Sequence, residues 1–195
     1  MSTARLVLRF GKRDEGRLVS SEDFAEADFD RPWKYERCEG RLIVLAPSGE
    51  GHIDASEPWR DQLVVYKLAP PGIVQKVVSE SWIRVDEGTD RIGDIGVYLV
   101  PAGPVTKIPD RVPELMFEVV SPDRTSRDRD YVRKRAEYDR LGVREYVILD
   151  RFRRVVTVLT IAPEGYAERH ISADEFYESP LLPGFSVRLS EAFPD

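Results

Sequence analysis

The sequence predicts an α/β (α+β) protein in which a mixed β-sheet carries helices on both faces. A chain of 195 residues with 42% hydrophobic and 33% charged residues has enough apolar side chains to bury a core. Short runs rich in valine, isoleucine and aromatic residues are interrupted by segments of helical spacing. We find no repeat, low-complexity tract or long linker. The sequence therefore predicts one domain over residues 1–195, with an N-terminal arm over about 1–20.

Local signals place the elements along the chain. Ser20 and the acids after it mark a helix start, because serine caps the first turn and carboxylates favour the helix N-terminus. Glu39 and Gly40 are typical of a hairpin turn, and Gly142 is typical of a helix C-terminus. The predicted elements, in chain order, are a helix over 20–29, a hairpin over 33–45, a helix over 53–68, one or two strands over 73–85, strands over 92–100 and 115–120, a helix over 129–141, strands over 145–150, 153–161, 167–171 and 185–189, and a helical turn over 190–193.

Composition and charge exclude several classes of protein. No apolar run approaches the ~20 residues of a membrane helix, and residues 1–9 lack the apolar segment of a signal peptide. Cys38 is the only cysteine, so we expect a cytoplasmic protein with no internal disulfide and no membrane contact. The net charge of -6 argues against coating nucleic acid by charge alone. Residues 121–154 differ, because ten arginines and one lysine there outnumber seven acids.

The central candidate is Glu118, which lies in a short apolar run flanked by prolines. A carboxylate in a buried strand costs several kcal/mol unless it is paired, protonated or bound to a metal. Asp94 lies in the preceding strand, and strand pairing could bring the two carboxylates to one face. Two neighbouring carboxylates repel each other, and Mg²⁺ binds one or two carboxylates together with waters. Lys134, the lone lysine of the next helix, shares a helix face with Asp130 and Tyr138.

Structural interpretations of the same residues remain open at this point. Glu118 could pair with a buried arginine, and Asp94 could simply end a strand. Lys134 could be a solvated charge on the helix. Spacing alone does not decide between these alternatives and a metal site.

A block between positions 118 and 150 carries a family resemblance. It comprises 118–122 (EVVSP), 130–134 (DYVRK), Tyr138, 141–146 (LGVREY) and Asp150. This block resembles the Uma family of endonucleases, which belongs to the PD-(D/E)XK, restriction-endonuclease-like superfamily. The segment 93–97 resembles the Pro-Asp strand of the family, and weaker likenesses are found in the hairpin over 35–42 and in His52. The resemblance covers about residues 20–193.

The resemblance implies a restriction-endonuclease-like core of α-β-β-β-α-β order and a Mg²⁺-dependent (or Mn²⁺-dependent) endonuclease that hydrolyses phosphodiester bonds of DNA. It implies that Asp94 and Glu118, with the backbone carbonyl of Val119, bind the metal. Lys134 corresponds to the catalytic lysine, which would steady the attacking water or the developing negative charge.

Two departures from the family pattern matter. Gly93 precedes Asp94 where the superfamily has proline, which alters the backbone more than the chemistry. Val120 occupies the usual position of the catalytic lysine. The helix must therefore direct Lys134 back toward the end of the strand.

Further residues are assigned less specific roles. Glu36 could orient a second metal or a water, or it could be an exposed hairpin charge. Tyr138 is a further site candidate that is more often a core residue, and we interpret His52 as structural or surface. The candidates for nucleic-acid binding are Arg124, Arg127, Arg129 and Arg133. Alternatively, these arginines form a solvated helix face with salt bridges to Asp123, Asp128 and Asp130.

Two functional readings follow. The first is a nuclease, and the resemblance to restriction-like enzymes implies that it acts as a homodimer, with one active site for each strand. The second is a catalytically inactive nuclease-fold protein that acts as a nucleic-acid or protein interaction module.

Overall fold

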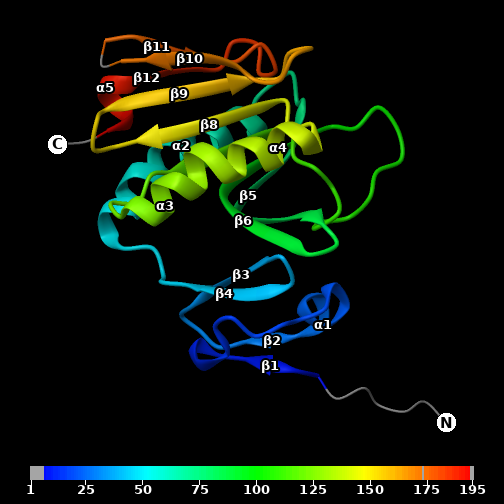
Figure 1. The fold of residues 1–195 in the computed structure, drawn as a ribbon. Helices are drawn as coiled ribbons and strands as arrows, with labels where there is room; N and C mark the ends of the chain where they lie inside the picture. The colour runs from blue at the N-terminus through cyan, green and yellow to red at the C-terminus, as the bar shows by residue number, and fades with distance from the viewer. Residues whose placement is uncertain (1–6, 173, 194–195) are drawn as a thin grey trace. The chain divides into compact units, whose positions relative to one another are not determined.

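The computed structural model describes residues 7–172 and 174–193, so residues 1–6 of the predicted arm lie outside the described part (Figure 1). The chain forms two compact units. Unit 1 runs to Ser48 and includes Trp82–Ile92, and unit 2 comprises Gly49–Ser81 and the chain from Gly93 onward. That the chain is one domain stays a prediction. No helix of the described residues is long and apolar enough to cross a membrane.

Unit 1 is built from short strands around one apolar cluster. Ser20 caps the first helix as predicted, because its side chain accepts the backbone N–H of Asp23. The predicted hairpin is present, and its turn residues Glu39 and Gly40 have φ of 51° and 75°. The elements are β1 (Arg9–Phe10), η1 (Lys12–Asp14), α1 (Ser21–Glu26), β2 (Asp28–Phe29), β3 (Lys34–Cys38) and β4 (Arg41–Leu45), with the end of β5 and the start of β6.

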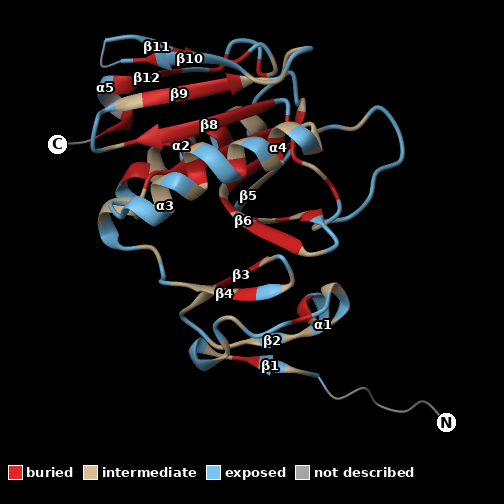
Figure 2. Cartoon of the chain, viewed as in Figure 1, coloured by how far each residue is buried: buried red, intermediate tan, exposed pale blue. Residues whose placement is uncertain are grey.

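Unit 2 contains a mixed sheet, as predicted. Its strand order is β10-β9-β8-β7-β6, and β5 pairs with β6. Strands β7 and β8 run parallel, whereas β6–β7, β8–β9 and β9–β10 are antiparallel. Figure 2 shows β8 and β9 as almost wholly buried. The strands are β5 (Val74–Asp86), β6 (Thr89–Leu99), β7 (Leu115–Val119), β8 (Glu145–Asp150), β9 (Val155–Thr160) and β10 (Ala167–Ile171), with a separate pair β11 (Phe176–Glu178) and β12 (Ser186–Arg188) before α5 (Leu189–Ala192).

Helices cover both faces of this sheet. Helix α2 (Glu50–Leu68) packs on the first face, where the Trp59 ring lies 5.9 Å from Phe117. The helical segment after β7 covers the second face, where Tyr138 meets Tyr146 edge-on at 5.0 Å. Because side chains alternate along a strand, Phe117 faces α2 and Glu118 faces the other helical layer. The order α2-β5-β6-β7-helix-β8 is the α-β-β-β-α-β order that the resemblance implies.

The helical segment after β7 starts earlier than predicted. It begins with α3 (Arg124–Asp128), where the Asp123 side chain accepts the backbone N–H of Ser126. A π-helical turn, η2 (Arg129–Lys134), follows, and α4 (Arg135–Leu141) completes it. Gly142 ends the helix as predicted, with φ of 80°. Hydrophobic spacing gave no sign of the earlier start, because α3 has no buried residue.

Gly93 leaves room for a buried methionine beside the site strand. A Cβ atom on Gly93 would overlap Met116 Sδ and lie 2.8 Å from its Cε. Met116 is fully buried, so its side chain has little space to move away. The departure from Pro-Asp to Gly-Asp is thus matched by the packing of the neighbouring strand.

Gly93→Ala should therefore destabilise the fold by about 1–3 kcal/mol through overpacking. Urea unfolding followed by circular dichroism measures this loss. Gly103→Ala is the matched control, because nothing lies within 4 Å of a Cβ at Gly103. In the Met116→Ala background the cost of Gly93→Ala should fall sharply. Equal costs in both backgrounds would contradict the packing argument.

Candidate active site

The two predicted acids face each other across neighbouring strands. β6 pairs with β7 so that Ile95 lies opposite Phe117 and Gly96 opposite Met116. Continuing this register by one residue sets Asp94 opposite Glu118. Side chains directly opposite in an antiparallel pair point to the same face. In accord with this, Asp94 Oδ2 accepts the backbone N–H of Val119 at 2.8 Å.

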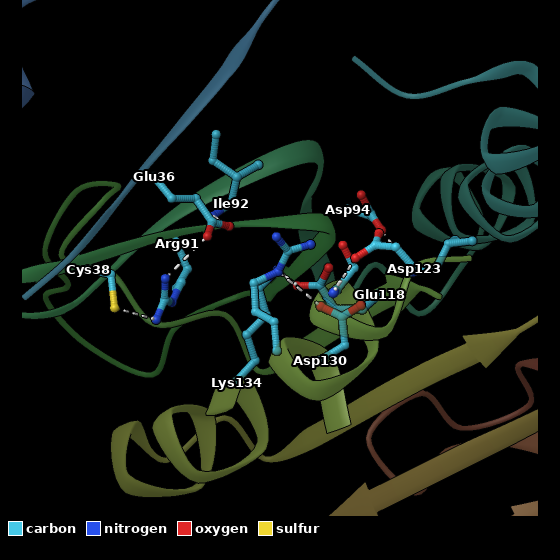
Figure 3. A network of polar contacts seen from close by, with 12 residues as sticks. Glu36, Cys38, Arg91, Ile92, Asp94, Glu118, Asp123, Asp130 and Lys134 are labelled. Carbon is cyan, nitrogen blue, oxygen red and sulfur yellow. Dashed lines mark hydrogen bonds and ion pairs between the residues drawn. The ribbon is translucent and has the colours of Figure 1, made fainter. Parts of the chain in front are cut away.

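Lys134 points back at the strand, as the resemblance required. Its Nζ donates to Glu118 Oε1 at 2.8 Å, and both side chains are almost completely buried (Figure 3). The Tyr138 hydroxyl donates to the same oxygen at 3.1 Å. Asp130 Oδ1 lies 3.9 Å from the Lys134 ammonium, on the same helix face. Tyr146 anchors this helix to the sheet, because its hydroxyl donates to the Asp130 carbonyl at 3.0 Å.

His52 is the residue that sequence reasoning undervalued. It lies in the first turn of α2, and its Nε2 is 3.0 Å from Asp94 Oδ1. Both oxygens of Asp94 are thereby held, one by His52 and the other by Val119. The only signal in the sequence was the weak family likeness at this position. Its contact with Asp94 depends on how the start of α2 meets the end of the strand.

Burial and charge set the protonation of the two acids. Burial raises the pKa of Glu118 to about 8, the Lys134 ammonium opposes that rise, and the Asp94 and Asp130 carboxylates add to it. Burial alone would also raise the pKa of Asp94. There the contacts with His52, the charge of Lys134 and the N–H of Val119 outweigh it, so the pKa of Asp94 lies below its usual range.

The donor set suits a magnesium ion. Among the described residues, no three His, Cys, Asp or Glu side chains form a metal-binding group. Two carboxylates completed by water and substrate oxygens are, however, the ligands that Mg²⁺ ordinarily takes from a protein. Both hydrogen bonds that reach Glu118 within the described chain end on Oε1, which leaves Oε2 for a cation. Burial is the main cause of the raised pKa of Glu118, and the Asp94 and Asp130 carboxylates add to it, so a cation beside Oε2 would oppose the rise.

Glu36 belongs to unit 1, where it is buried. Its Oε1 accepts the backbone N–H of Ile92 at 3.0 Å, and its Oε2 lies 3.3 Å from Arg91 Nη1 (Figure 3). It is therefore not an exposed hairpin charge. Its suggested part in orienting a metal or water stays a prediction.

The four arginines proposed to bind nucleic acid have different surroundings. Arg124 and Arg133 are exposed. Arg127 donates to Asp150 at 2.7 Å, and Arg129 Nε lies 3.5 Å from Asp130 Oδ1. Arg129 thus contacts one of the acids that the alternative reading named, whereas Arg127 contacts Asp150, which that reading did not name.

Replacing Glu118 should stabilise the metal-free protein. Glutamate ionises near pH 4.5 when unfolded and near pH 8 in this fold, so the native state holds the extra proton and stability falls as pH rises between these values. The stability of Glu118→Gln should not fall with pH in this way. Its free energy of unfolding at pH 8 in EDTA should exceed that of the wild type by about 1–2 kcal/mol. Lys134→Met should lose stability, because it leaves the buried carboxylates without their cation. Urea unfolding at pH 5 and pH 8 measures both; the same sign for the two variants would refute the electrostatic account.

Comparison with known proteins identifies the fold and the family of the chain. Among curated proteins none matches the chain. The crystal structure of "a putative nuclease belonging to DUF820 from Anabaena variabilis ATCC 29413" has a similar fold, with a TM-score of 0.71 and 14% sequence identity over 90% of this chain and 97% of that one. The family model described as "Uma2: Putative restriction endonuclease" matches residues 21–190. The chain therefore belongs to the Uma2 family of restriction-endonuclease-like nucleases.

Proposed function

We propose that this protein is a Mg²⁺-dependent endonuclease that hydrolyses phosphodiester bonds of DNA, with Mn²⁺ as a possible substitute for Mg²⁺. The observation that carries this proposal is the buried cluster in which Asp94 lies opposite Glu118 and Lys134 contacts Glu118 at 2.8 Å. Two acids and an ammonium in one place are the groups that metal-assisted phosphodiester hydrolysis uses. Family membership supports nuclease chemistry in general.

In this proposal Asp94 and Glu118 hold the metal, together with the backbone carbonyl of Val119. Held there, the ion would supply polarisation of the scissile phosphate and a lower pKa of an adjacent water. His52 and the N–H of Val119 keep the Asp94 carboxylate ionised and oriented, since each bonds one of its oxygens. A fixed ligand costs no reorganisation when substrate arrives.

Lys134 supplies positive charge next to the metal ligands. Its ammonium is held between Glu118 and Asp130 in a water-poor environment, where charge interactions are strong. There it can steady the attacking water or the negative charge that develops on the phosphate. Tyr138 restrains Glu118 through its hydrogen bond and has no proposed contact with substrate.

The partners in this proposal are DNA and a second copy of the chain. The exposed Arg124 and Arg133, together with the half-buried Arg127 and Arg129, would contact the phosphate backbone. A homodimer would provide one active site for each strand. The single cysteine, Cys38, agrees with a cytoplasmic setting.

Cleavage of DNA by the purified protein tests the proposal. With Mg²⁺, Glu118→Gln and Lys134→Met should each lower cleavage of plasmid and single-stranded DNA by about 100-fold or more. Glu145→Gln is the matched control, because Glu145 is equally buried but bonds Tyr177 and Ser179. The same assay with RNA tests whether the protein prefers DNA. If the wild-type protein cuts no nucleic acid in Mg²⁺ or Mn²⁺, the proposed nuclease function is wrong.

Metal binding can be measured without activity. Adding Mg²⁺ should raise the melting temperature of the wild-type protein by about 2–6 °C, because the ion binds only the folded state and relieves repulsion at Glu118. Asp94→Asn should abolish this shift, and Glu145→Gln should keep it. Equal shifts in all three proteins would place the ion elsewhere.

The alternative function is a catalytically inactive nuclease-fold module. One observation favours it: Lys134 already forms a direct ion pair with Glu118. Among the described residues no arginine pairs with Glu118, however, and the Asp94 and Glu118 side chains point to the same face of the sheet. Those two features favour the enzyme.

A further inference from the structure

An exposed phenylalanine lies in the turn between β8 and β9. Phe152 is 47% exposed, whereas every residue of the preceding strand β8 is buried. Two guanidinium groups accompany its ring, with Arg151 Cζ 4.3 Å and Arg127 Cζ 5.8 Å from the ring centre. An aromatic ring that combines solvent exposure with positive charge is the arrangement that proteins use to bind single-stranded nucleic acid.

The turn that presents Phe152 is held in place by a buried acid. Asp150 Oδ1 accepts the backbone N–H groups of Phe152 and Arg153, each at 3.1 Å. Its Oδ2 accepts from Arg127 at 2.7 Å and from the Tyr131 hydroxyl at 3.3 Å. Asp150 thus couples the turn to the helix that carries Lys134. The ring is presented by a braced turn rather than by a loose loop.

This turn adjoins the candidate active site within unit 2. β7 and β8 run parallel with Glu118 opposite Ile148, so their carboxyl ends lie at the same edge of the sheet. The Arg151 guanidinium also packs against the start of α2, because a Cβ on Gly51 would lie 3.2 Å from Arg151 Cζ. The next residue, His52, contacts Asp94.

Arg151 differs from its neighbour Arg127 in having no acidic partner at its buried nitrogen. Its Nε is buried and has no hydrogen-bond partner among the described residues, whereas Arg127 is paired with Asp150. The Nε N–H is closed off from solvent, so a phosphate would be bound by the other N–H groups of this guanidinium, whose charge no acid of the described residues pairs with.

We infer that the β8–β9 turn binds one unstacked nucleotide of the substrate, with its base against the exposed part of the Phe152 ring and its phosphate on Arg151. The inference rests on the proposed function and names its substrate class more closely. Because bases in a duplex already stack on each other, the turn favours a single strand or a distorted duplex.

Binding of a fluorescein-labelled single-stranded oligonucleotide, followed by anisotropy with Ca²⁺ in place of Mg²⁺, tests this inference. Phe152→Ala should weaken binding about tenfold and leave the salt dependence unchanged, because a stacking contact releases no counterion. Phe152→Tyr should restore binding. Arg151→Gln should weaken binding and lower the slope of log affinity against log salt by about 0.7. All effects should be smaller on an intact duplex.

Phe176→Ala is the matched control. Phe176 is 50% exposed and has Arg188 5.8 Å from its ring centre, but it lies in β11. Equal affinities of the Phe152→Ala and Phe176→Ala proteins, or no binding by the wild type, would overturn the inference. Phe152-dependent binding without any cleavage would uphold it and reject the proposed enzyme. Cleavage by the wild type together with binding that does not depend on Phe152 would uphold the proposed enzyme and reject the inference.

Discussion

The ion pair between Lys134 and Glu118 is the interaction on which the rest of this site depends. Glu118 lies in the central strand with both faces of the sheet covered, so its charge has almost no access to water. The 2.8 Å contact with Lys134 offsets part of that cost, and it can form only if the following helix folds back over the strand. The π turn and the bond from Tyr146 to the Asp130 carbonyl hold the helix there.

The same cluster remains electrostatically unbalanced. Lys134 and Arg129 face the three carboxylates of Asp94, Glu118 and Asp130, and burial together with the neighbouring acids keeps the pKa of Glu118 near 8. A protein selected for stability alone would gain by replacing these groups with apolar ones. In the proposed function a divalent cation would supply further positive charge to this cluster.

The two departures from the superfamily pattern are understandable from packing. Gly93 is accommodated because Met116 fills the space that a side chain would take. Val120 is fully buried, and its N–H donates to the Leu149 carbonyl. The residue therefore continues the hydrogen bonding between β7 and β8. The ammonium reaches Glu118 from the helix instead. In the proposed mechanism the chemistry depends on where the ammonium lies in space, and not on which residue number carries it.

The sequence by itself determined the mixed sheet, the hairpin at Glu39 and Gly40, the helix stop at Gly142 and the candidate acids, because periodicity, turn residues and buried charge are local signals. It did not reveal the start of the helix at Arg124, since α3 buries no residue. Only the tertiary structure decided that His52 contacts Asp94 and that Phe152 lies beside the site. Those contacts depend on which ends of strands and helices meet, and no local pattern encodes that.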